Sequence, residues 1–310
     1  MEGARSPHYG AATTATTPKE APMIAQTTFT LANGIPIPRL GLGTWMIADA
    51  AAARAVIDAV ALGYRHIDTA QAYGNEAGVG AGIRACGLPR DAIFLTTKLA
   101  AEVKTYAEAA AAIDGSLAAL GVDAIDLMLI HSPQPWASFG AEDRCFAGNR
   151  EAWRALEDAL AAGKLRAIGV SNFQQVDLES LMATCTVPPM VNQVLAHISN
   201  TPTDLIAWCQ ARGILVEAYS PIAHGELLKN EAVAQMAAQY GVTVPQLCIR
   251  YTLELGLLPL PKTANPAHMQ SNADVDFALS ADDLATLRGL ETIRDYGEAS
   301  VFPVYRDPRA

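Results

Sequence analysis

Four ionisable side chains stand at or just beyond the ends of three apolar segments that are typical of buried strands. The segments cover residues 64–68, 93–97 and 127–131. The four side chains are Asp68, Tyr73, Lys98 and His131. In parallel α/β barrel enzymes the carboxyl ends of the strands carry the catalytic groups, so we expect these side chains to converge. Together they could transfer a proton to a substrate.

The reaction that suits these groups is the reduction of a carbonyl. A phenol has a pKa of about 10, so Tyr73 is a useful proton donor near neutrality only if a neighbouring cation favours its ionised form. Lys98 can supply that cation, and Asp68 within reach would keep the lysine charged. His131 can donate a hydrogen bond to a carbonyl oxygen. The set therefore fits hydride attack on a carbonyl carbon while Tyr73 protonates the oxygen.

Each of the four residues, taken singly, also has an ordinary structural explanation. Asp68 could cap a turn, Tyr73 could pack at a barrel rim, Lys98 could be a solvated strand end, and His131 could be a hydrogen-bonded core imidazole. Their joint occurrence at successive strand ends favours the catalytic interpretation.

The elements that must position these residues alternate regularly. From residue 40 onward, apolar β-like runs alternate with stretches rich in Ala, Leu and Glu, as in βα units with parallel strands. The candidate strands are residues 40–43, 64–68, 93–97, 127–131, 167–170, 191–194, 215–218 and 257–260. Helices are expected at 50–61, 107–120 and 150–162, each followed by a glycine that can end it. Eight units without a linker predict an α/β fold, a closed (β/α)8 TIM barrel.

An N-terminal β-hairpin should precede the barrel. Residues 28–31 and 35–37 flank Asn33-Gly34, a strong signal for a tight turn between two strands. Residues 1–26, rich in Ala, Thr and Pro, are interpreted as a flexible tail. Residues 27–310 then form a single catalytic domain that includes the C-terminal segment.

A doubly wound open sheet is the alternative fold. Its nucleotide-binding fingerprint is missing, because the run Gly78-Val79-Gly80-Ala81-Gly82 has the wrong glycine spacing and no strand directly before it. The closed barrel is therefore favoured.

Composition limits the possible partners. With 51% hydrophobic and 17% charged residues, the 310-residue chain can bury the core of a compact enzyme. A formal charge of -10 argues against general affinity for nucleic acid or anionic membrane, and no apolar run is long enough to cross a bilayer. The five cysteines are scattered without a CxxC pair, which indicates neither a disulfide framework nor a zinc site. We expect a cytoplasmic protein, monomeric or weakly homo-oligomeric, that acts on a small molecule.

The segment from Gly63 to Glu76, the next two strand ends and the run Gly169-Val170-Ser171-Asn172-Phe173 together resemble the aldo-keto reductase superfamily. The resemblance extends over roughly residues 28–277. It implies that the four ionisable residues match the family's catalytic tetrad, which reduces aldehydes and ketones with a nicotinamide dinucleotide and needs no metal.

The same resemblance implies the residues that hold the nicotinamide. Ser171, Asn172 and Gln193 match the groups that bind its carboxamide, and Tyr219 matches the aromatic residue that stacks on the ring. Thr44 and Ser220 complete the expected contacts at this end of the cofactor.

The adenosine end of the cofactor is expected beside the last strand. Lys262, Thr263 and Asn272 match the family segment that contacts the 2′-phosphate and adenine. Asn265 is expected to cap a helix that begins at Pro266, so its N-terminus would face an anion. His268 stands where members that strongly prefer NADPH carry arginine, and an imidazole holds phosphate less firmly than a guanidinium fork. We therefore expect NADPH, with NADH also possible.

The substrate side of the pocket is expected to be aromatic. Trp45 and Trp136 match residues that line it in the family, and an apolar mouth favours carbonyl compounds with a hydrophobic or flat part. Trp136 lies in a long loop, residues 132–148, and the segment from about 294 to 305 is expected to fold back towards the pocket.

These observations predict an NAD(P)H-dependent carbonyl reductase in which Tyr73 donates the proton. One alternative is a non-catalytic cofactor-sensing or partner-binding protein on the same barrel. A second is an unrelated barrel lyase that uses Lys98 to form a Schiff base.

Overall fold

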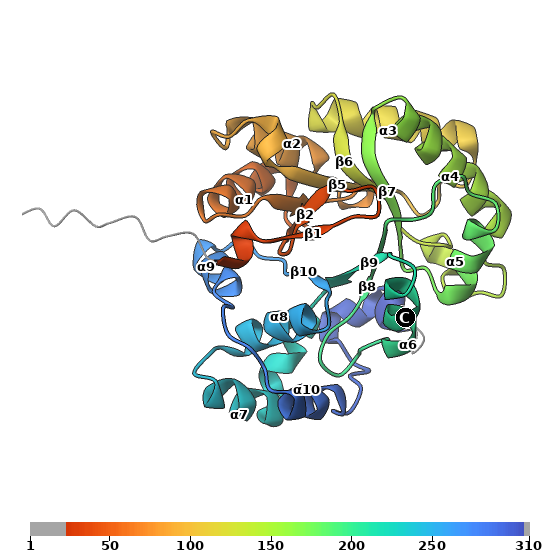
Figure 1. Cartoon of the computed structure of the whole chain (residues 1–310). Coiled ribbons are helices and arrows are strands. Elements are labelled where there is room, and N and C mark those ends of the chain that lie inside the picture. The colour runs from red at the N-terminus through yellow and green to blue at the C-terminus, as the bar shows by residue number, and fades with distance from the viewer. Residues whose placement is uncertain (1–22, 307–310) are drawn as a thin grey trace, which may run out of the picture.

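The computed structural model of the chain describes residues 23–306 (Figure 1). Most of the predicted tail, residues 1–22, lies outside the described residues. The last four tail residues were assigned wrongly, because Met23–Gln26 form a short 3-10 helix in which Ile24 is buried. Ile24 thus packs into the core of the folded domain, although it was assigned to the tail.

Eight parallel strands follow one another around the molecule in chain order, as predicted. They are β3 (Leu42–Gly43), β4 (His66–Asp68), β5 (Phe94–Leu99), β6 (Ile125–Ile130), β7 (Leu165–Ser171), β8 (Val191–Leu195), β9 (Leu215–Tyr219) and β10 (Leu258–Leu260). The barrel closes where the Gly41 amide donates to the Pro259 carbonyl at 3.2 Å and the Gly43 amide donates to the Pro261 carbonyl at 3.1 Å. A closed barrel leaves the strands no free edge.

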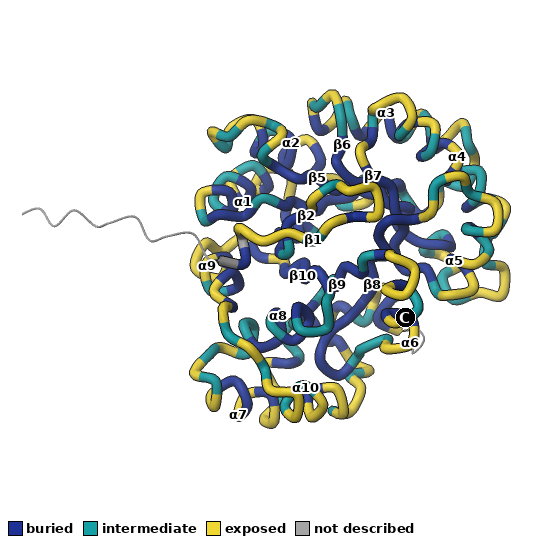
Figure 2. Tube along the Cα trace, in the orientation of Figure 1, coloured by how far each residue is buried: buried dark blue, intermediate teal, exposed yellow. Residues whose placement is uncertain are grey.

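Helices surround the strands and bury their apolar faces against them (Figures 1 and 2). They are α1 (Asp49–Ala61), α2 (Glu76–Ala85), α3 (Tyr106–Leu120), α4 (Phe146–Ala161), α5 (Gln175–Met182), α6 (Thr203–Gln210), α7 (Glu231–Gln239), α8 (Val244–Glu254), α9 (Pro266–Ala273) and α10 (Ala281–Arg288). All three helices predicted by range are present. Helix α9 begins as predicted, with the Asn265 side chain accepting from the Ala267 amide at 2.9 Å.

The glycine-rich run at residues 78–82 serves helix packing. It lies within α2, and a Cβ at Gly78 would stand 2.2 Å from the Asp49 carbonyl oxygen. A Cβ at Gly80 would stand 2.0 Å from the Leu120 carbonyl oxygen. Glycine is therefore required so that α2 can lie close to α1 and to the end of α3.

The predicted hairpin covers the amino-terminal end of the barrel (Figure 1). Its strands, β1 (Thr28–Thr30) and β2 (Pro36–Pro38), pair antiparallel. Leu31 and Ile37 are buried in one cluster with residues from the barrel strands, and the Asn33 side chain donates to the Arg166 carbonyl at 2.9 Å. With this end closed, the carboxyl ends of the strands are left as the open end.

Two segments complete the open end. The predicted loop of residues 132–148 is shorter than expected, because α4 begins at Phe146, and Trp136–Ser138 form a 3-10 helix inside it. After α10 the chain forms two more 3-10 helices, Gly297–Val301 and Pro303–Tyr305. Across residues 23–306, no helix combines the length and apolar character that a membrane span requires.

Candidate active site

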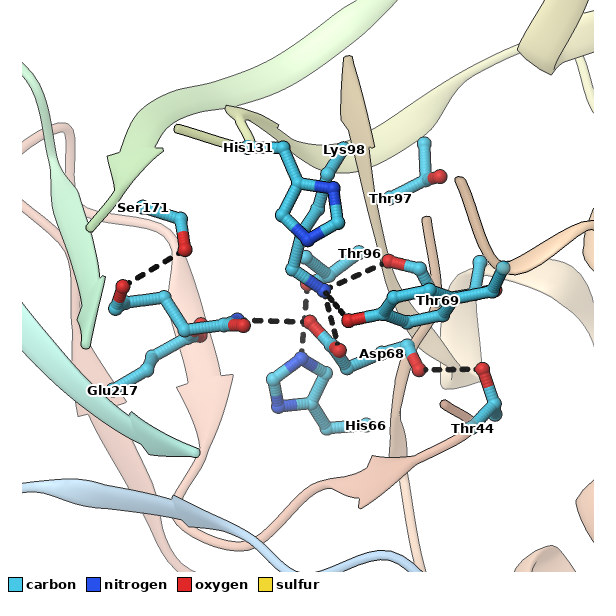
Figure 3. Close-up of polar contacts among 12 residues, drawn as sticks. Thr44, His66, Asp68, Thr69, Thr96, Thr97, Lys98, His131, Ser171 and Glu217 are labelled. Atoms are coloured by element: carbon cyan, nitrogen blue, oxygen red, sulfur yellow. Dashed lines mark hydrogen bonds and ion pairs between the residues drawn. The ribbon is translucent and has the colours of Figure 1, made fainter. Parts of the chain in front are cut away.

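A buried lysine joins three of the four predicted catalytic residues. Lys98 on β5 has no exposed surface, and its Nζ lies 2.6 Å from Asp68 Oδ1 and 3.3 Å from the Tyr73 hydroxyl (Figure 3). It also donates to the Thr69 carbonyl at 2.9 Å. The ammonium group thus donates each of its three hydrogens to one of these oxygens. The predicted order of Asp68, Lys98 and Tyr73 is thus present as a chain of contacts.

The loop after β4 holds Tyr73 in place through the buried amide side chain of Asn75. Asn75 accepts from the Thr69 hydroxyl at 2.7 Å and donates to the backbone carbonyls of Thr44 and Ile47 at 2.9 Å. Gly74 ends the 3-10 helix Gln71–Tyr73 with φ 65°, a left-handed conformation that favours glycine. Tyr73 is therefore anchored to the loops after two neighbouring strands.

The charges of the site act on one another. Burial lowers the pKa of Lys98, but the Asp68 carboxylate and Tyr73 outweigh burial and raise the lysine pKa above its usual value. Burial raises the pKa of Tyr73, and the Lys98 charge offsets only part of that rise. Lys98 therefore acts in the predicted direction, but its effect is smaller than the effect of burial. Lys98 is charged and Tyr73 is protonated near neutral pH.

His131 lies beside Tyr73 at the end of β6. The two rings meet edge to face with centroids 5.6 Å apart, and the Trp136 ring lies 5.1 Å from the histidine on another side. Burial, with the Lys98 charge, holds the pKa of His131 well below its usual value, so the imidazole is neutral. Its Nδ1 has no hydrogen-bond partner among residues 23–306. We therefore assign the ring hydrogen to Nε2.

A second polar network extends from His131 along the strand ends. Asn172, at φ 63°, donates to the His131 carbonyl at 2.9 Å and to Ser171 Oγ at 3.1 Å, and accepts from the Tyr219 hydroxyl at 2.8 Å. Ser171 Oγ in turn donates to the Gln193 carbonyl at 2.9 Å (Figure 3). These bonds fix the position of the Tyr219 ring.

Gln193 connects this network to the tetrad. Its amide nitrogen donates to Asp68 Oδ2 at 2.9 Å and to Glu217 Oε2 at 2.7 Å. Both amide hydrogens are thereby engaged, which leaves the amide oxygen free to accept a hydrogen bond from a ligand.

A cavity of about 640 Å³ opens above these groups, within the range of about 300–1,000 Å³ usual for small-molecule and cofactor sites. The predicted site residues that line it are Trp45, Asp68, Tyr73, His131, Trp136, Ser171, Asn172, Gln193, Tyr219, Ser220 and Lys262. These residues come from seven different strand ends, so only the fold brings them together.

Five of the predicted residues do not line the cavity. Lys98 lies behind the cavity wall, and its ammonium group contacts Tyr73, which lines the cavity. Thr44 is fully buried and donates to the Asp68 carbonyl at 2.9 Å, so its hydroxyl supports the end of the neighbouring strand. Thr263, His268 and Asn272 belong to the loop after β10 and to α9, outside the lining set; Thr263 Oγ accepts from the Asn265 amide at 3.0 Å.

The C-terminal segment lines the cavity as expected and brings an aromatic cluster with it. Phe302 lies 4.8 Å and His224 lies 5.4 Å from Trp45, measured between ring centroids. The Tyr305 hydroxyl lies 2.8 Å from Ser220 Oγ and 2.7 Å from His224 Nε2. His224 was not predicted, and no local pattern in the sequence marks it.

Glu217 was also missed, although its signal was present in the sequence. It is a carboxylate inside the otherwise apolar run of residues 214–218, where a buried strand was predicted. It has no exposed surface and lies behind Gln193.

A sequence model of the Aldo/keto reductase family matches residues 39–292. The chain belongs to the aldo/keto reductase family. This membership confirms the predicted superfamily and makes the protein an NAD(P)H-dependent oxidoreductase.

Individual relatives agree along nearly their whole length. The chain is 39% identical over 271 residues to glyoxal reductase of Bacillus subtilis, a match that covers 87% of this chain and 94% of that protein. The solved structure of MGS-M4, an aldo-keto reductase from a Medee basin deep-sea metagenome library, is 38% identical with a TM-score of 0.80, covering 86% of this chain and 95% of that one. Bombyx mori aldo-keto reductase in complex with NADP is 32% identical with a TM-score of 0.77, covering 90% and 98%.

The cavity suits a nicotinamide dinucleotide. It offers a fixed aromatic face at Tyr219, an acceptor at the Gln193 amide oxygen, and a cation at Lys262. The N-terminus of α9, at Pro266, lies four residues after Lys262 and carries positive potential.

Proposed function

We propose that the protein reduces aldehydes or ketones to alcohols with NADPH and that Tyr73 donates the proton. The observation that carries the proposal is the position of Tyr73, which lines the cavity beside His131 while its hydroxyl lies 3.3 Å from Lys98 Nζ.

Each residue of the tetrad then has one task. Tyr73 is protonated near neutral pH, so it can give a proton to an oxygen on which negative charge develops. The Lys98 ammonium stabilises the phenolate that remains, and Asp68 keeps that ammonium charged. His131, neutral and with its hydrogen on Nε2, donates a hydrogen bond to the carbonyl oxygen and orients it towards Tyr73.

The cofactor would lie along the later strands. When bound, NADPH supplies the hydride. Tyr219 offers its ring to the nicotinamide, and the Gln193 amide oxygen accepts from the carboxamide. Hydrogen bonds with Ser171 and Asn172 fix the positions of Gln193 and Tyr219. Lys262 faces the phosphates.

NADPH is proposed because Lys262 lines the cavity, where its charge could meet a phosphate, and because the Bombyx mori relative binds NADP. With His268 exposed at α9 in place of an arginine, the preference over NADH should be modest. Thr263 and Asn272 are proposed to join this end of the site once the cofactor is present. Thr44 is proposed to act indirectly, through the Asp68 backbone that it holds.

The substrate is proposed to be a neutral carbonyl compound with a flat or apolar part. Trp45, Trp136 and Phe302 line this side, and Lys262 is the one cationic side chain among the described lining residues. Aromatic and apolar walls of this kind favour ligands with a flat or apolar part. The similarity to glyoxal reductase adds 1,2-dicarbonyl compounds to the candidates.

The Schiff-base alternative is disfavoured by the environment of Lys98. An amine must lose its proton before it can attack a carbonyl, whereas this ammonium contacts three oxygens and is held charged by Asp68. Borohydride trapping with a carbonyl substrate should therefore give no adduct.

The experiment that tests the proposal measures oxidation of NADPH and NADH, side by side, against aromatic, aliphatic and 1,2-dicarbonyl compounds. We expect turnover with both cofactors and a modest preference for NADPH. Tight cofactor binding without any turnover would instead support the non-catalytic sensor. A monomeric or weakly homo-oligomeric state and a cytoplasmic location remain predictions.

A further inference from the structure

Glu217 is a carboxyl group buried in the barrel interior, on the same side of the close-up as Ser171 (Figure 3). It is hydrogen-bonded to Gln193, one of the residues of the proposed nicotinamide site. It lies on β9, paired in register with Gln193 on β8 and with Leu258 on β10. Its Oε2 accepts one hydrogen bond, from the Gln193 amide nitrogen at 2.7 Å. Its Oε1 is buried and has no hydrogen-bond partner among residues 23–306.

The surroundings of Glu217 disfavour a negative charge. A fully buried carboxylate with one neutral donor loses most of its solvation. The nearest charges are Asp68 on β4, which repels it, and Lys98 on β5, which is already paired with Asp68. His66 on β4 gives no compensating charge, because burial lowers its pKa to about 3.

Burial, together with the Asp68 charge, raises the pKa of Glu217 to about 8. The raised pKa favours the protonated acid at neutral pH, which removes the negative charge from a carboxyl group whose Oε1 has no partner among the described residues. In this state it accepts from Gln193 without adding charge beside Asp68.

We propose that Glu217 is a positioning residue for the reaction, held neutral so that it fixes the Gln193 amide with its hydrogens on Asp68 and Glu217 and its oxygen towards the cavity. The proposal rests on the proposed function, because that oxygen matters only if it receives the carboxamide of the cofactor. It assigns Glu217 no contact with substrate or cofactor.

Two consequences follow for the cofactor and the tetrad. Without the Glu217 acceptor, the Gln193 amide can turn and present its nitrogen to the cavity, which weakens cofactor binding. Once Glu217 ionises, at a pH of about 8, a second negative charge stands near Asp68 and makes Tyr73 harder to ionise. Alcohol oxidation, which needs ionised Tyr73, should then require a higher pH.

The test compares Glu217→Gln with Glu217→Leu, and uses Glu231→Gln on the exposed start of α7 as the control. Glutamine is neutral and keeps an acceptor for Gln193, whereas leucine removes it. We expect Glu217→Gln to bind NADPH within about twofold of wild type and Glu217→Leu to bind roughly tenfold more weakly, in line with one lost hydrogen bond. Titration calorimetry measures both without turnover.

Infrared difference spectra of the apoprotein test the protonation state directly. Wild type and Glu231→Gln should lose a protonated-carboxyl band as the pH rises through about 8, and Glu217→Gln should lack that band. The rise of alcohol oxidation with pH should begin at lower pH in Glu217→Gln than in wild type.

Three outcomes would overturn the proposal: Glu217→Gln binding NADPH as weakly as Glu217→Leu, unchanged binding in Glu217→Leu, or a wild type without the carboxyl band. If Glu217→Leu does not fold, the infrared spectrum of Glu217→Gln and the pH dependence of its alcohol oxidation still test the proposal. If wild type binds NADPH but never turns over, the proposed function fails, while the spectra and binding constants still test Glu217.

Discussion

Replacing Lys98 by methionine should damage both stability and catalysis, because it removes one partner of a buried ion pair. Methionine is apolar and nearly as long as the aliphatic part of lysine, so the substitution leaves little empty space. The Asp68 carboxylate would keep its bond from Gln193 but lose the ammonium at 2.6 Å. A single amide donor does not replace a buried cation.

The expected cost follows from this geometry. Removing one member of a buried pair destabilises proteins by about 3–5 kcal/mol, because the other charge stays buried and uncompensated. For domains somewhat smaller than this one, 1 kcal/mol shifts the melting temperature by about 2–4 °C, so we expect a fall of roughly 6–20 °C. The turnover number should fall by at least about 10²-fold, because Tyr73 loses the cation that stabilises its phenolate.

A double-mutant cycle measures how strongly the two side chains stabilise each other. It compares the thermal unfolding of wild type, Lys98→Met, Asp68→Asn and the double variant. The double variant carries neither charge, so it should melt well above Lys98→Met even though it has two substitutions. Equal melting of wild type and Lys98→Met, or additive losses in the double variant, would refute the reasoning about the buried pair.

Three further predictions test other parts of the account. Gly80→Ala should destabilise the fold by about 1–3 kcal/mol in chemical denaturation, since its Cβ would stand 2.0 Å from the Leu120 carbonyl oxygen, whereas Gly115→Ala, with nothing within 4 Å, should be neutral or stabilising. His268→Arg should increase the ratio of kcat/KM for NADPH over NADH without changing the turnover number; an unchanged ratio would place the 2′-phosphate elsewhere. Because the pKa of Glu217 is raised in the folded state, its stabilising contribution is complete below the unfolded pKa and is lost as the pH rises to about 8. In urea unfolding, the stability of Glu217→Gln relative to wild type should therefore increase as the pH rises from the unfolded pKa to about 8. If the free energy of unfolding changes with pH in the same way in both proteins, the raised pKa is contradicted.

The barrel was predictable because its signals are local. Each buried strand of a βα unit is a short apolar run, and each helix between strands has its own composition and stop signal. The tetrad was predictable for a related reason. Asp68, Lys98 and His131 end consecutive strands, and parallel strands in sequential order bring their carboxyl ends together.

The remaining features depend on contacts between distant parts of the chain. Trp45, His224 and Phe302 meet at the cavity although more than 250 positions separate the first and last of them. The Thr44 hydroxyl donates to the Asp68 carbonyl on the neighbouring strand, a contact that the residues around Thr44 do not indicate. The effect of burial on Tyr73 likewise required the assembled walls of the pocket.

The most direct test of the central claim is the turnover of Tyr73→Phe with saturating NADPH and an aromatic aldehyde. Tyr106→Phe, which removes a hydroxyl from the outer surface of α3, is the matched control. We expect Tyr73→Phe to bind NADPH normally but to lose at least about 10²-fold in turnover number, while Tyr106→Phe matches wild type. Turnover of Tyr73→Phe at the wild-type rate would show that another group donates the proton, and it would contradict the role proposed for the Asp68, Lys98 and Tyr73 chain.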